Sequence, residues 1–505
     1  MRRLAILFPL LLTPAFAAAQ RPAVTGRAAE AGGGVAYATV TLLRGDRQAA
    51  GGATDAEGRY ALTRNADAGF VFYSLPSAYK VSVDKTYKLP RFFARLQAGT
   101  ARYDFTLEAL AAPEKRFDLI CIGDPQINEA SHAVRFKEEA GREIREYAAS
   151  AGVPCYGITL GDHVNNKWTL FTNMVVALQP EQTGVPVFAT IGNHDHEFPT
   201  ADEKAARAKY ESYFGPVDYS FNRGDVHVVS MDNVIHSCKA SADYEGGFTA
   251  AQYAWLKQDL SFVPKDKMVI LCVHIPFRGG WGTNSAHADA DKYYDEVLDL
   301  LSQYEYAAIM SAHTHSNINY IHRKNGKEIF EHVTGTTCGA WWRSTVCTEG
   351  TPIGFGLYRI DGNRMEEWAY RSVRHDEQFQ IRLYRASDTF VGGAKYRFKQ
   401  TGADQIVANI WNWDPSWTVN VYENDVLSGQ MTRNSDIDAW TVAYHIGLLN
   451  NTDSYRKSSD HMFHYTLKNP AAAVRVEAID RFGNKYEQTV FTDPAEHPGD
   501  FHADF

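Results

Sequence analysis

Between residues 117 and 312 the chain repeats one pattern, a short apolar segment that ends directly in polar residues. The apolar segments read FDLICI, VPCYGITL, VPVFATI, DVHVVSM, KMVILCV and YAAIMSA. Helix-forming stretches lie between them, at residues 131–149, from Thr249 onward with Gln252 as its capping-box partner, and at residues 288–303. The alternation of strands and helices predicts a layered α/β domain.

Five polar clusters stand where these segments end, and they read GDPQ, GDHVNN, GNHDH, VHIP and AHTH. Ligands bind at the carboxyl ends of strands in α/β sheets, so we expect the clusters to converge at one edge. Glycine directly before Asp162 and directly before Asn193 allows sharp turns and close backbone approach. The donors suit hard or borderline divalent cations, and they are enough for two ions that share a carboxylate. They are Asp124, Gln126, Asp162, Asn193, His274, His313 and His315.

The ordered blocks D-x-[HQ], GDxx[DN], GNH[DE], H and [GA]HxH resemble those of the calcineurin-like metallophosphoesterase family. The resemblance implies a central metallophosphoesterase β-sandwich flanked by helices, within a secreted bacterial chain of three parts. It implies a first metal held by Asp124, Gln126, Asp162 and His315. It implies a second metal held by Asp162, Asn193, His274 and His313, with Asp162 bridging the two ions.

The same resemblance implies a reaction. A hydroxide that bridges the two metals attacks the phosphorus of a phosphate mono- or diester in line. His194 protonates the leaving group and Asn165 orients His194. The formal net charge is −9 and no basic tract is present, so the expected partner is a small phosphoester rather than a nucleic acid. The sequence leaves the choice between monoester and diester, and the oligomeric state, open.

Two positions depart from the family pattern. Gln126 stands where many members have His, and Ala312 stands where they often have Gly. On an extended backbone, side chains two residues apart point the same way, so we expect Gln126 to offer its amide oxygen to the ion that Asp124 binds. An amide oxygen is a harder and weaker donor than imidazole, which favours Mn²⁺, Mg²⁺ or Fe²⁺ over Zn²⁺.

Four further residues are candidates for substrate contact. Trp341 and Trp342 are adjacent and are followed by Arg343, a group that suits stacking on a sugar, base or acyl group and binding of phosphate. The alternative is that the Trp pair packs within its loop. Arg278 lies in a glycine-rich segment after His274 and is a second candidate phosphate ligand.

The rest of the chain divides into three stretches around this domain. Residues 1–19 have a basic start, a short apolar run and small residues near the end, which predicts a cleaved signal peptide and a secreted or periplasmic protein. Residues 20–112 resemble a transthyretin-like, immunoglobulin-like β-sandwich module. The catalytic domain is expected at residues 113–376 and a C-terminal all-β domain at residues 377–505. The sequence leaves open whether Cys338 and Cys347, which flank a short loop, form a disulfide.

Two other functions compete with this interpretation. A protein Ser/Thr phosphatase of the same superfamily is disfavoured, because an exported enzyme meets few phosphoproteins. A glycan-binding surface protein with a degenerate central domain predicts that metal ligands are lost, whereas competent donors occupy all seven positions.

Overall fold

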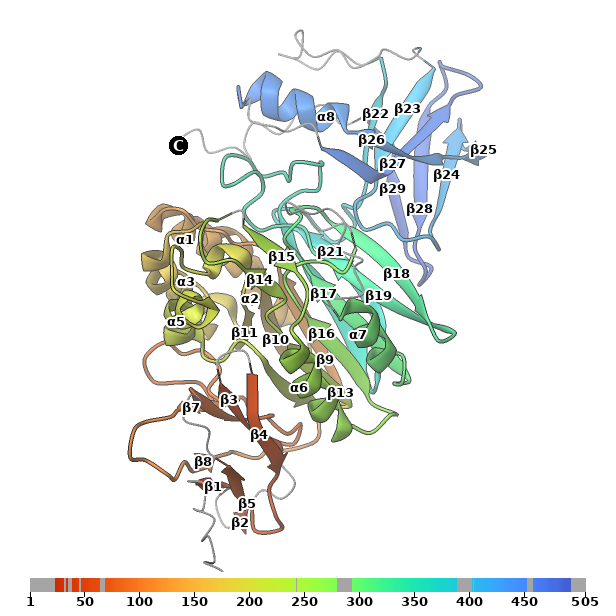
Figure 1. Cartoon of the computed structure of the whole chain (residues 1–505). Coiled ribbons are helices and arrows are strands. Elements are labelled where there is room, and N and C mark those ends of the chain that lie inside the picture. The colour runs from red at the N-terminus through yellow and green to blue at the C-terminus, as the bar shows by residue number, and fades with distance from the viewer. Residues whose placement is uncertain are drawn as a thin grey trace, which may run out of the picture.

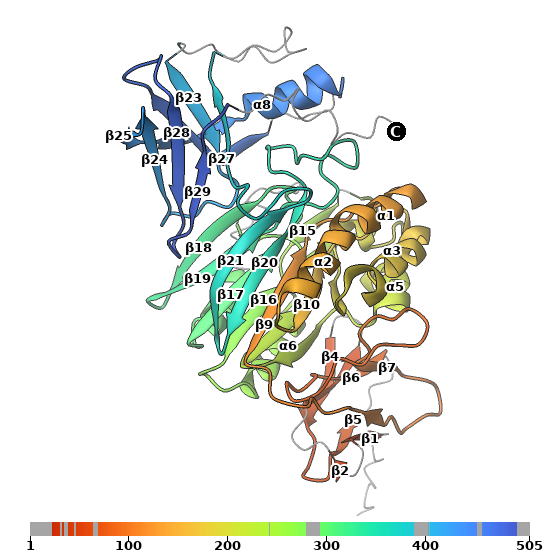
Figure 2. The ribbon, with the colours of Figure 1, turned by 180° about the vertical axis from the view of Figure 1, so that it is seen from behind.

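The computed structural model describes residues 23–30, 33–34, 39–44, 47–63, 69–241, 243–278, 293–387, 402, 404–451 and 457–491. An N-terminal β module and a C-terminal β part lie at opposite ends of a central α/β body (Figures 1 and 2). Residues 1–19, on which the predicted signal peptide falls, lie outside the described residues. Among the described residues, no helix combines the length and hydrophobicity that crossing a membrane requires.

Two sheets form the central body. The five-stranded sheet has the order β11-β10-β9-β20-β21 and the six-stranded sheet has the order β12-β13-β16-β17-β19-β18. Strands β9, β10 and β11 pair in parallel, as do β13, β16, β17 and β19. The bounds are β9 Arg116–Ile122, β10 Cys155–Leu160, β11 Val187–Thr190, β12 Tyr219–Arg223, β13 Val226–Ser230, β16 Met268–Cys272, β17 Tyr306–Ser311, β18 Ile318–Lys324, β19 Lys327–Val333, β20 Gly354–Asp361 and β21 Arg364–Ser372.

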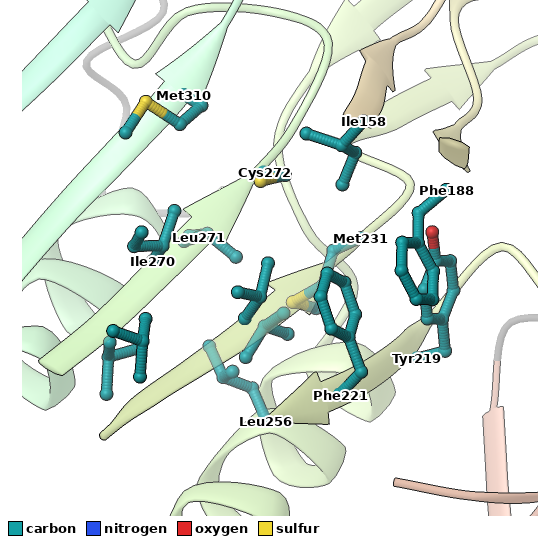
Figure 3. Packing of buried hydrophobic residues seen from close by; sticks show 14 of the residues in the cluster. Ile158, Phe188, Tyr219, Phe221, Met231, Leu256, Ile270, Leu271, Cys272 and Met310 are labelled. Carbon is teal, nitrogen blue, oxygen red and sulfur yellow. The ribbon is translucent and has the colours of Figure 1, made fainter. Parts of the chain in front are cut away.

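The two sheets pack face to face over one hydrophobic layer. Strand alternation sends Leu119 and Cys121 of β9 into this layer, while Ile120 and Ile122 face the helices on the other side. The rings of Phe188 and Phe221, one from each sheet, stack with centroids 3.8 Å apart. Figure 3 shows this layer with side chains of both sheets, among them Ile158, Phe188, Phe221, Cys272 and Met310. The predicted layered α/β architecture is therefore confirmed, and each of the six apolar segments forms a strand.

Helices cover the outer faces of both sheets. The helix expected at residues 131–149 is present as α1 (Ala130–Phe136), a π turn (Lys137–Gly141) and α2 (Arg142–Ser150), followed by α3 (Phe171–Ala177) and α4 (Pro180–Thr183). Helix α5 (Glu203–Phe214) packs beside them. Helix α6 (Ala250–Ser261) begins with the predicted Thr249–Gln252 capping box. The third expected helix is seen as α7 (Tyr294–Leu301), and residues 288–292 lie outside the described residues.

The N-terminal module contains two small sheets. One joins β1 (Ala23–Glu30), β2 (Gly33–Gly34), β5 (Arg59–Thr63) and β8 (Phe105–Thr106), and the other has the order β4-β3-β6-β7. The latter strands are β3 Thr39–Arg44, β4 Arg47–Ala53, β6 Phe70–Tyr73 and β7 Phe93–Arg95. The module shares one hydrophobic cluster with the central body, in which Phe92 contacts Tyr219 with ring centroids 4.6 Å apart.

The C-terminal part also contains two sheets, of order β22-β23-β27-β26 and β25-β24-β28-β29. Their bounds are β22 Arg382–Arg385, β23 Gln405–Asn409, β24 Thr418–Glu423, β25 Val426–Gln430, β26 Thr432–Ile437, β27 Ser458–Thr466, β28 Val474–Ile479 and β29 Lys485–Gln488. Helix α8 (Ala439–Val442) and a π helix (Ala443–Leu448) precede β27. A separate two-stranded sheet, β14 (Val234–His236) with β15 (Tyr244–Gly246), belongs to the central body. All six cysteines of the chain are buried thiols, so Cys338 and Cys347 are not joined.

Candidate metal centre

The predicted ligands follow directly after buried strands, in turns whose backbone is left-handed. Five of the seven have a positive φ, between 37° and 64°, namely Asp124, Gln126, Asp162, His313 and His315. Non-glycine residues rarely adopt this region, and such strain concentrates at functional sites, where the surrounding structure holds it in place. The expectation that Asp124 and Gln126 lie on an extended segment is therefore wrong, because the chain leaves the strand and turns at both residues.

Asp162 lies between two groups of donors. Its Oδ2 accepts a hydrogen bond from the Gln126 amide at 3.2 Å, and its Oδ1 lies 3.3 Å from Nε2 of His274. On the Gln126 side, Nε2 of His315 lies 3.7 Å from Oδ1 of Asp124. This is the set of side chains that the family resemblance assigns to the first metal.

The second group surrounds Nε2 of His274. Oδ1 of Asn193 lies 2.9 Å from that nitrogen and Nδ1 of His313 lies 3.1 Å from it. Nδ1 of His274 donates to the carbonyl oxygen of Leu160 at 2.7 Å, so a neutral His274 directs the lone pair of Nε2 at these donors. Lone pairs that face one another are stabilised by a cation between them, and a histidine ligand commonly donates its other nitrogen in this way. Asp162, His274 and His313 form a compact group suited to hold a metal ion.

The buried atoms of the first group also fit a cation. Asp124 Oδ1, Gln126 Oε1 and His315 Nδ1 are buried and have no hydrogen-bond partner among the described residues. Burial raises the pKa of Asp124 to about 8, and the nearby Asp162 carboxylate also raises it. A divalent cation would restore the charged carboxylate and satisfy the oxygens. The donor set therefore fits two cations that share Asp162.

His194 lies at the edge of these donors, with 24% of its side chain exposed. Its Nε2 is 4.0 Å from Oδ2 of Asp162, and its Nδ1 is 2.9 Å from Oδ1 of Asn166. The residue that orients His194 is therefore Asn166, and the prediction of Asn165 is wrong by one position. Asn166 has a φ of 55°, and this left-handed turn brings its side chain to His194.

Asp195 joins two of the ligand-bearing turns, a role that the sequence did not reveal. Its carboxylate accepts hydrogen bonds from the backbone nitrogens of His163 at 2.8 Å and Gly192 at 3.0 Å, and from Nδ1 of His163 at 2.9 Å. His196 is held by the carbonyl oxygen of Gly192 and by Asp232. His163 and His196 are fully buried and therefore support the turns rather than contact a substrate.

A pocket of about 120 Å³ lies against the centre. Tyr244 and Thr348 line it although no sequence motif marked them, and the Tyr244 hydroxyl is 3.3 Å from Nε2 of His313. Tyr244 reaches the site from the β14–β15 hairpin, which has no motif of its own. The lining residues are Gln126, Asp162, His194, Tyr244, His313, Thr314, His315, Trp341 and Thr348.

The four residues predicted to contact substrate have different surroundings. Trp341 is 36% exposed, lines the pocket and lies beside the His315 ring with centroids 5.1 Å apart. Trp342 is 1% exposed, donates its indole N–H to the Pro125 carbonyl oxygen at 2.9 Å, and so has a packing role. Arg343 is exposed but does not line the pocket, and Arg278 lies over the Tyr320 ring, 5.4 Å from its centroid.

Purple acid phosphatases of Arabidopsis thaliana are curated relatives of the chain. Purple acid phosphatase 23 is 26% identical over 181 residues and purple acid phosphatase 18 is 25% identical over 182 residues. These alignments cover 33% and 34% of this chain and 36% and 38% of the relatives. The chain thus spans little more than a third of the length of these curated relatives.

Solved structures are also similar to about half of the chain. A dimetal phosphatase from Danio rerio is 12% identical, with 51% of this chain and 98% of that chain covered and a TM-score of 0.36. A 5'-nucleotidase from Candida albicans is 13% identical, with 52% of each chain covered and a TM-score of 0.33.

Three family models match the chain one after another. The N terminal of Calcineurin-like phosphoesterase matches residues 22–110, Calcineurin-like phosphoesterase matches residues 104–317, and the C terminal of Calcineurin-like phosphoesterase matches residues 331–486. The matches confirm the resemblance that the ordered motifs indicated. Because the three models together extend from residue 22 to residue 486, the chain belongs to the calcineurin-like phosphoesterase family.

Proposed function

We propose that the chain is a dinuclear metal-dependent phosphoesterase that hydrolyses small phosphate mono- or diesters. The observation that carries this proposal is the meeting of Asp162 with six other donor residues, from five separate segments in all, beside a pocket that His194 also lines. Family membership supports the same reaction class. Bound there, two divalent cations would polarise the phosphoester and lower the pKa of a bound water.

Different residues around the pocket would bind the substrate and transfer the proton. The acceptor oxygen of Asn166 takes the hydrogen on Nδ1 of His194, so the catalytic proton is exchanged at Nε2. Nε2 faces the pocket near Asp162, where it can deliver a proton to the leaving oxygen as a general acid. Trp341 and Tyr244 give the pocket aromatic walls against which the organic part of the ester can pack.

The choice of metal follows from Gln126. Its amide nitrogen is engaged by Asp162, which leaves Oε1 as a neutral oxygen donor for the first cation. Oxygen donors favour Mn²⁺, Mg²⁺ or Fe²⁺ over Zn²⁺. We therefore propose one of these three ions in the first position, and Gln126→His should shift the metal preference of the enzyme towards Zn²⁺.

The test is hydrolysis of p-nitrophenyl phosphate and bis(p-nitrophenyl) phosphate by the full chain loaded in turn with Mn²⁺, Mg²⁺ and Zn²⁺. We expect Asp162→Ala to lose more than about 100-fold in kcat/KM, because both cations lose a ligand. Asp225→Ala is the matched control, since that aspartate pairs with Lys267 at the surface. Full activity of Asp162→Ala, or activity that survives exhaustive chelation, would exclude the proposed function.

Export from the cytoplasm, which residues 1–19 predict, is part of the same proposal. Amino-terminal sequencing of the protein recovered from its native cell tests it. A mature chain that begins near residue 20 is expected, and an intact cytoplasmic chain contradicts it.

A further inference from the structure

We propose that Lys457, in the C-terminal part of the chain, is a positioning residue for the metal centre. Its ammonium group holds the turn at residues 312–316 in the conformation that directs His313 and His315 at the metals. The inference rests on the proposed function, because it assigns to the C-terminal part a role in metal binding at that same site.

The turn that carries the two histidines is strained. After β17 ends at Ser311, His313 has a φ of 64° and His315 a φ of 54°, both in the left-handed region. For residues with a Cβ atom this conformation is unfavourable, and it persists only where neighbouring groups hold it. The ligand geometry of the turn therefore needs partners outside the turn.

Lys457 supplies such partners on both sides of His315. Its Nζ donates to the carbonyl oxygen of Thr314 and, at 2.6 Å, to the hydroxyl of Ser316. The Thr314 carbonyl lies between the two histidines in sequence, so a fixed carbonyl limits the rotation of the backbone on either side. Hydrogen bonds from a charged donor are roughly twice as strong as those between neutral groups.

The charge on Lys457 is balanced inside the same interface. Burial lowers the pKa of Lys457 to about 8, while Glu349 and Asp124 oppose this shift, so the ammonium form dominates at pH 7. Glu349 is 1% exposed and accepts hydrogen bonds from the backbone nitrogens of Asn317 at 3.0 Å and Thr351 at 2.7 Å. The Lys457 ammonium group thus binds the chain on both sides of His315, and the Glu349 carboxylate binds it at Asn317, two residues after His315.

Another contact ties the end of this turn to the C-terminal part. Nδ2 of Asn317 donates to the carbonyl oxygen of Trp411 at 2.8 Å. Further along, Nδ2 of Asn319 donates to the carbonyl oxygens of Asn412 at 3.0 Å and Trp413 at 3.2 Å. The C-terminal part therefore packs on the segment that bears two of the proposed metal ligands. Within this contact, Lys457 binds the residues directly before and directly after His315.

A role in interface stability alone would lower the melting temperature without changing the affinity of the folded protein for metal. If Lys457 positions the metal ligands, then a variant that lacks Lys457 should still fold and should bind metal more weakly. The experiment is therefore an isothermal titration of the chelator-stripped full chain with Mn²⁺ alone, with circular dichroism to show that each variant is folded. The variants are Lys457→Met, Lys457→Arg, Ser316→Ala and Lys468→Met.

We expect Lys457→Met to raise the Mn²⁺ dissociation constant by about tenfold or more, the size of effect seen when groups that orient metal ligands are removed. Lys457→Arg keeps the charge and should restore part of the affinity. Lys468→Met is the matched control, because Lys468 also belongs to the C-terminal part but donates to the Ser428 carbonyl of β25. It should bind Mn²⁺ as the unaltered chain does.

A folded Lys457→Met protein with unaltered Mn²⁺ affinity would overturn the proposal. If Lys457→Met does not fold, Ser316→Ala provides the test, because it removes one acceptor of Lys457 and keeps both the ammonium group and the Glu349 carboxylate that balances its charge. We expect it to weaken Mn²⁺ binding roughly threefold or more, and unaltered binding would overturn the proposal. Failure of the unaltered chain to bind two Mn²⁺ ions would instead refute the dinuclear centre, so the two failures are distinguishable.

Discussion

At the scale of single residues, the contact with Asn166 determines which nitrogen of His194 is available for the proton transfer that we propose. Oδ1 of Asn166 is 2.9 Å from Nδ1 of His194 and can only accept, so Nδ1 keeps its hydrogen and Nε2 faces the pocket. We expect Asn166→Ala to lower kcat for p-nitrophenyl phosphate by roughly tenfold to 100-fold, with Mn²⁺ affinity nearly unchanged, because general acid catalysis contributes about 10²–10⁴-fold.

The neighbouring asparagine is the matched control for this experiment. Asn165→Ala removes the same amide one position earlier and should keep a kcat close to that of the unaltered chain. Equal losses in both variants, or a loss in Asn165→Ala alone, would show that the contact between Asn166 and His194 does not orient the acid.

Asn166 contacts His194 where Asn165 was predicted, which shows that the local sequence does not specify the direction of a side chain in a turn. Residue types and spacing were enough to select seven donors that meet in the structure, because parallel strands bring their carboxyl ends to the same edge of a sheet. Which of two adjacent asparagines faces His194 depends on the backbone conformation of the turn, in which Asn166 has a φ of 55°. The same kind of backbone conformation at Asp124 and Gln126 is why an extended segment was the wrong expectation there.

At the scale of elements, the parallel strands were predictable and their antiparallel neighbours were much less so. Strands such as β10 and β16 are buried throughout, so they read as continuous apolar runs. Strand β20 pairs antiparallel with β9, with Gly356 opposite Cys121. Nothing in the local sequence of either strand identifies a partner so distant along the chain. No sequence motif marks the β14–β15 hairpin either, so the position of Tyr244 in the pocket could not be predicted.

The turn that follows β11 brings backbone against the shared ligand. A Cβ atom added at Gly192 would lie 2.3 Å from both the backbone nitrogen and Oδ1 of Asp162, a distance that real Cβ atoms do not reach. We expect Gly192→Ala to displace the Asp162 carboxylate and to weaken Mn²⁺ binding by about tenfold or more, measured by isothermal titration.

A second glycine variant separates this effect from the general cost of a glycine replacement. A Cβ atom at Gly69 meets no other atom within 4 Å, so Gly69→Ala should bind Mn²⁺ as the unaltered chain does. If Gly192→Ala also binds Mn²⁺ with unaltered affinity, then the close approach of the two turns does not determine the position of Asp162.

At the scale of the whole molecule, the two ends of the chain contact the central body in different places. The C-terminal part contacts the turn after β17, next to the metal ligands. The N-terminal module contacts β12, where Asn222 donates its backbone N–H to the Leu75 carbonyl oxygen at 2.8 Å. Arg223 pairs with Val226, the first residue of β13, and therefore lies at the end of the sheet opposite to the carboxyl ends that carry the donors. The contact at Arg223 should thus affect stability and leave metal binding unchanged.

Arg223 is the residue through which this separation can be tested. It is fully buried, donates to the carbonyl oxygens of Pro76 at 3.1 Å and of Tyr79, and lies 3.4 Å from the Glu114 carboxylate. Arg223→Met removes a buried positive charge that pairs with Glu114 and donates to two carbonyl oxygens of the module, which should cost about 3 kcal/mol and split the calorimetric unfolding of the shared core into two transitions. Arg95→Met, which removes an exposed arginine of the same module, should unfold as the unaltered chain does. Since the centre lies at the other end of the sheet, Arg223→Met should bind Mn²⁺ with unaltered affinity, and a marked loss would mean that the module helps to shape the metal site.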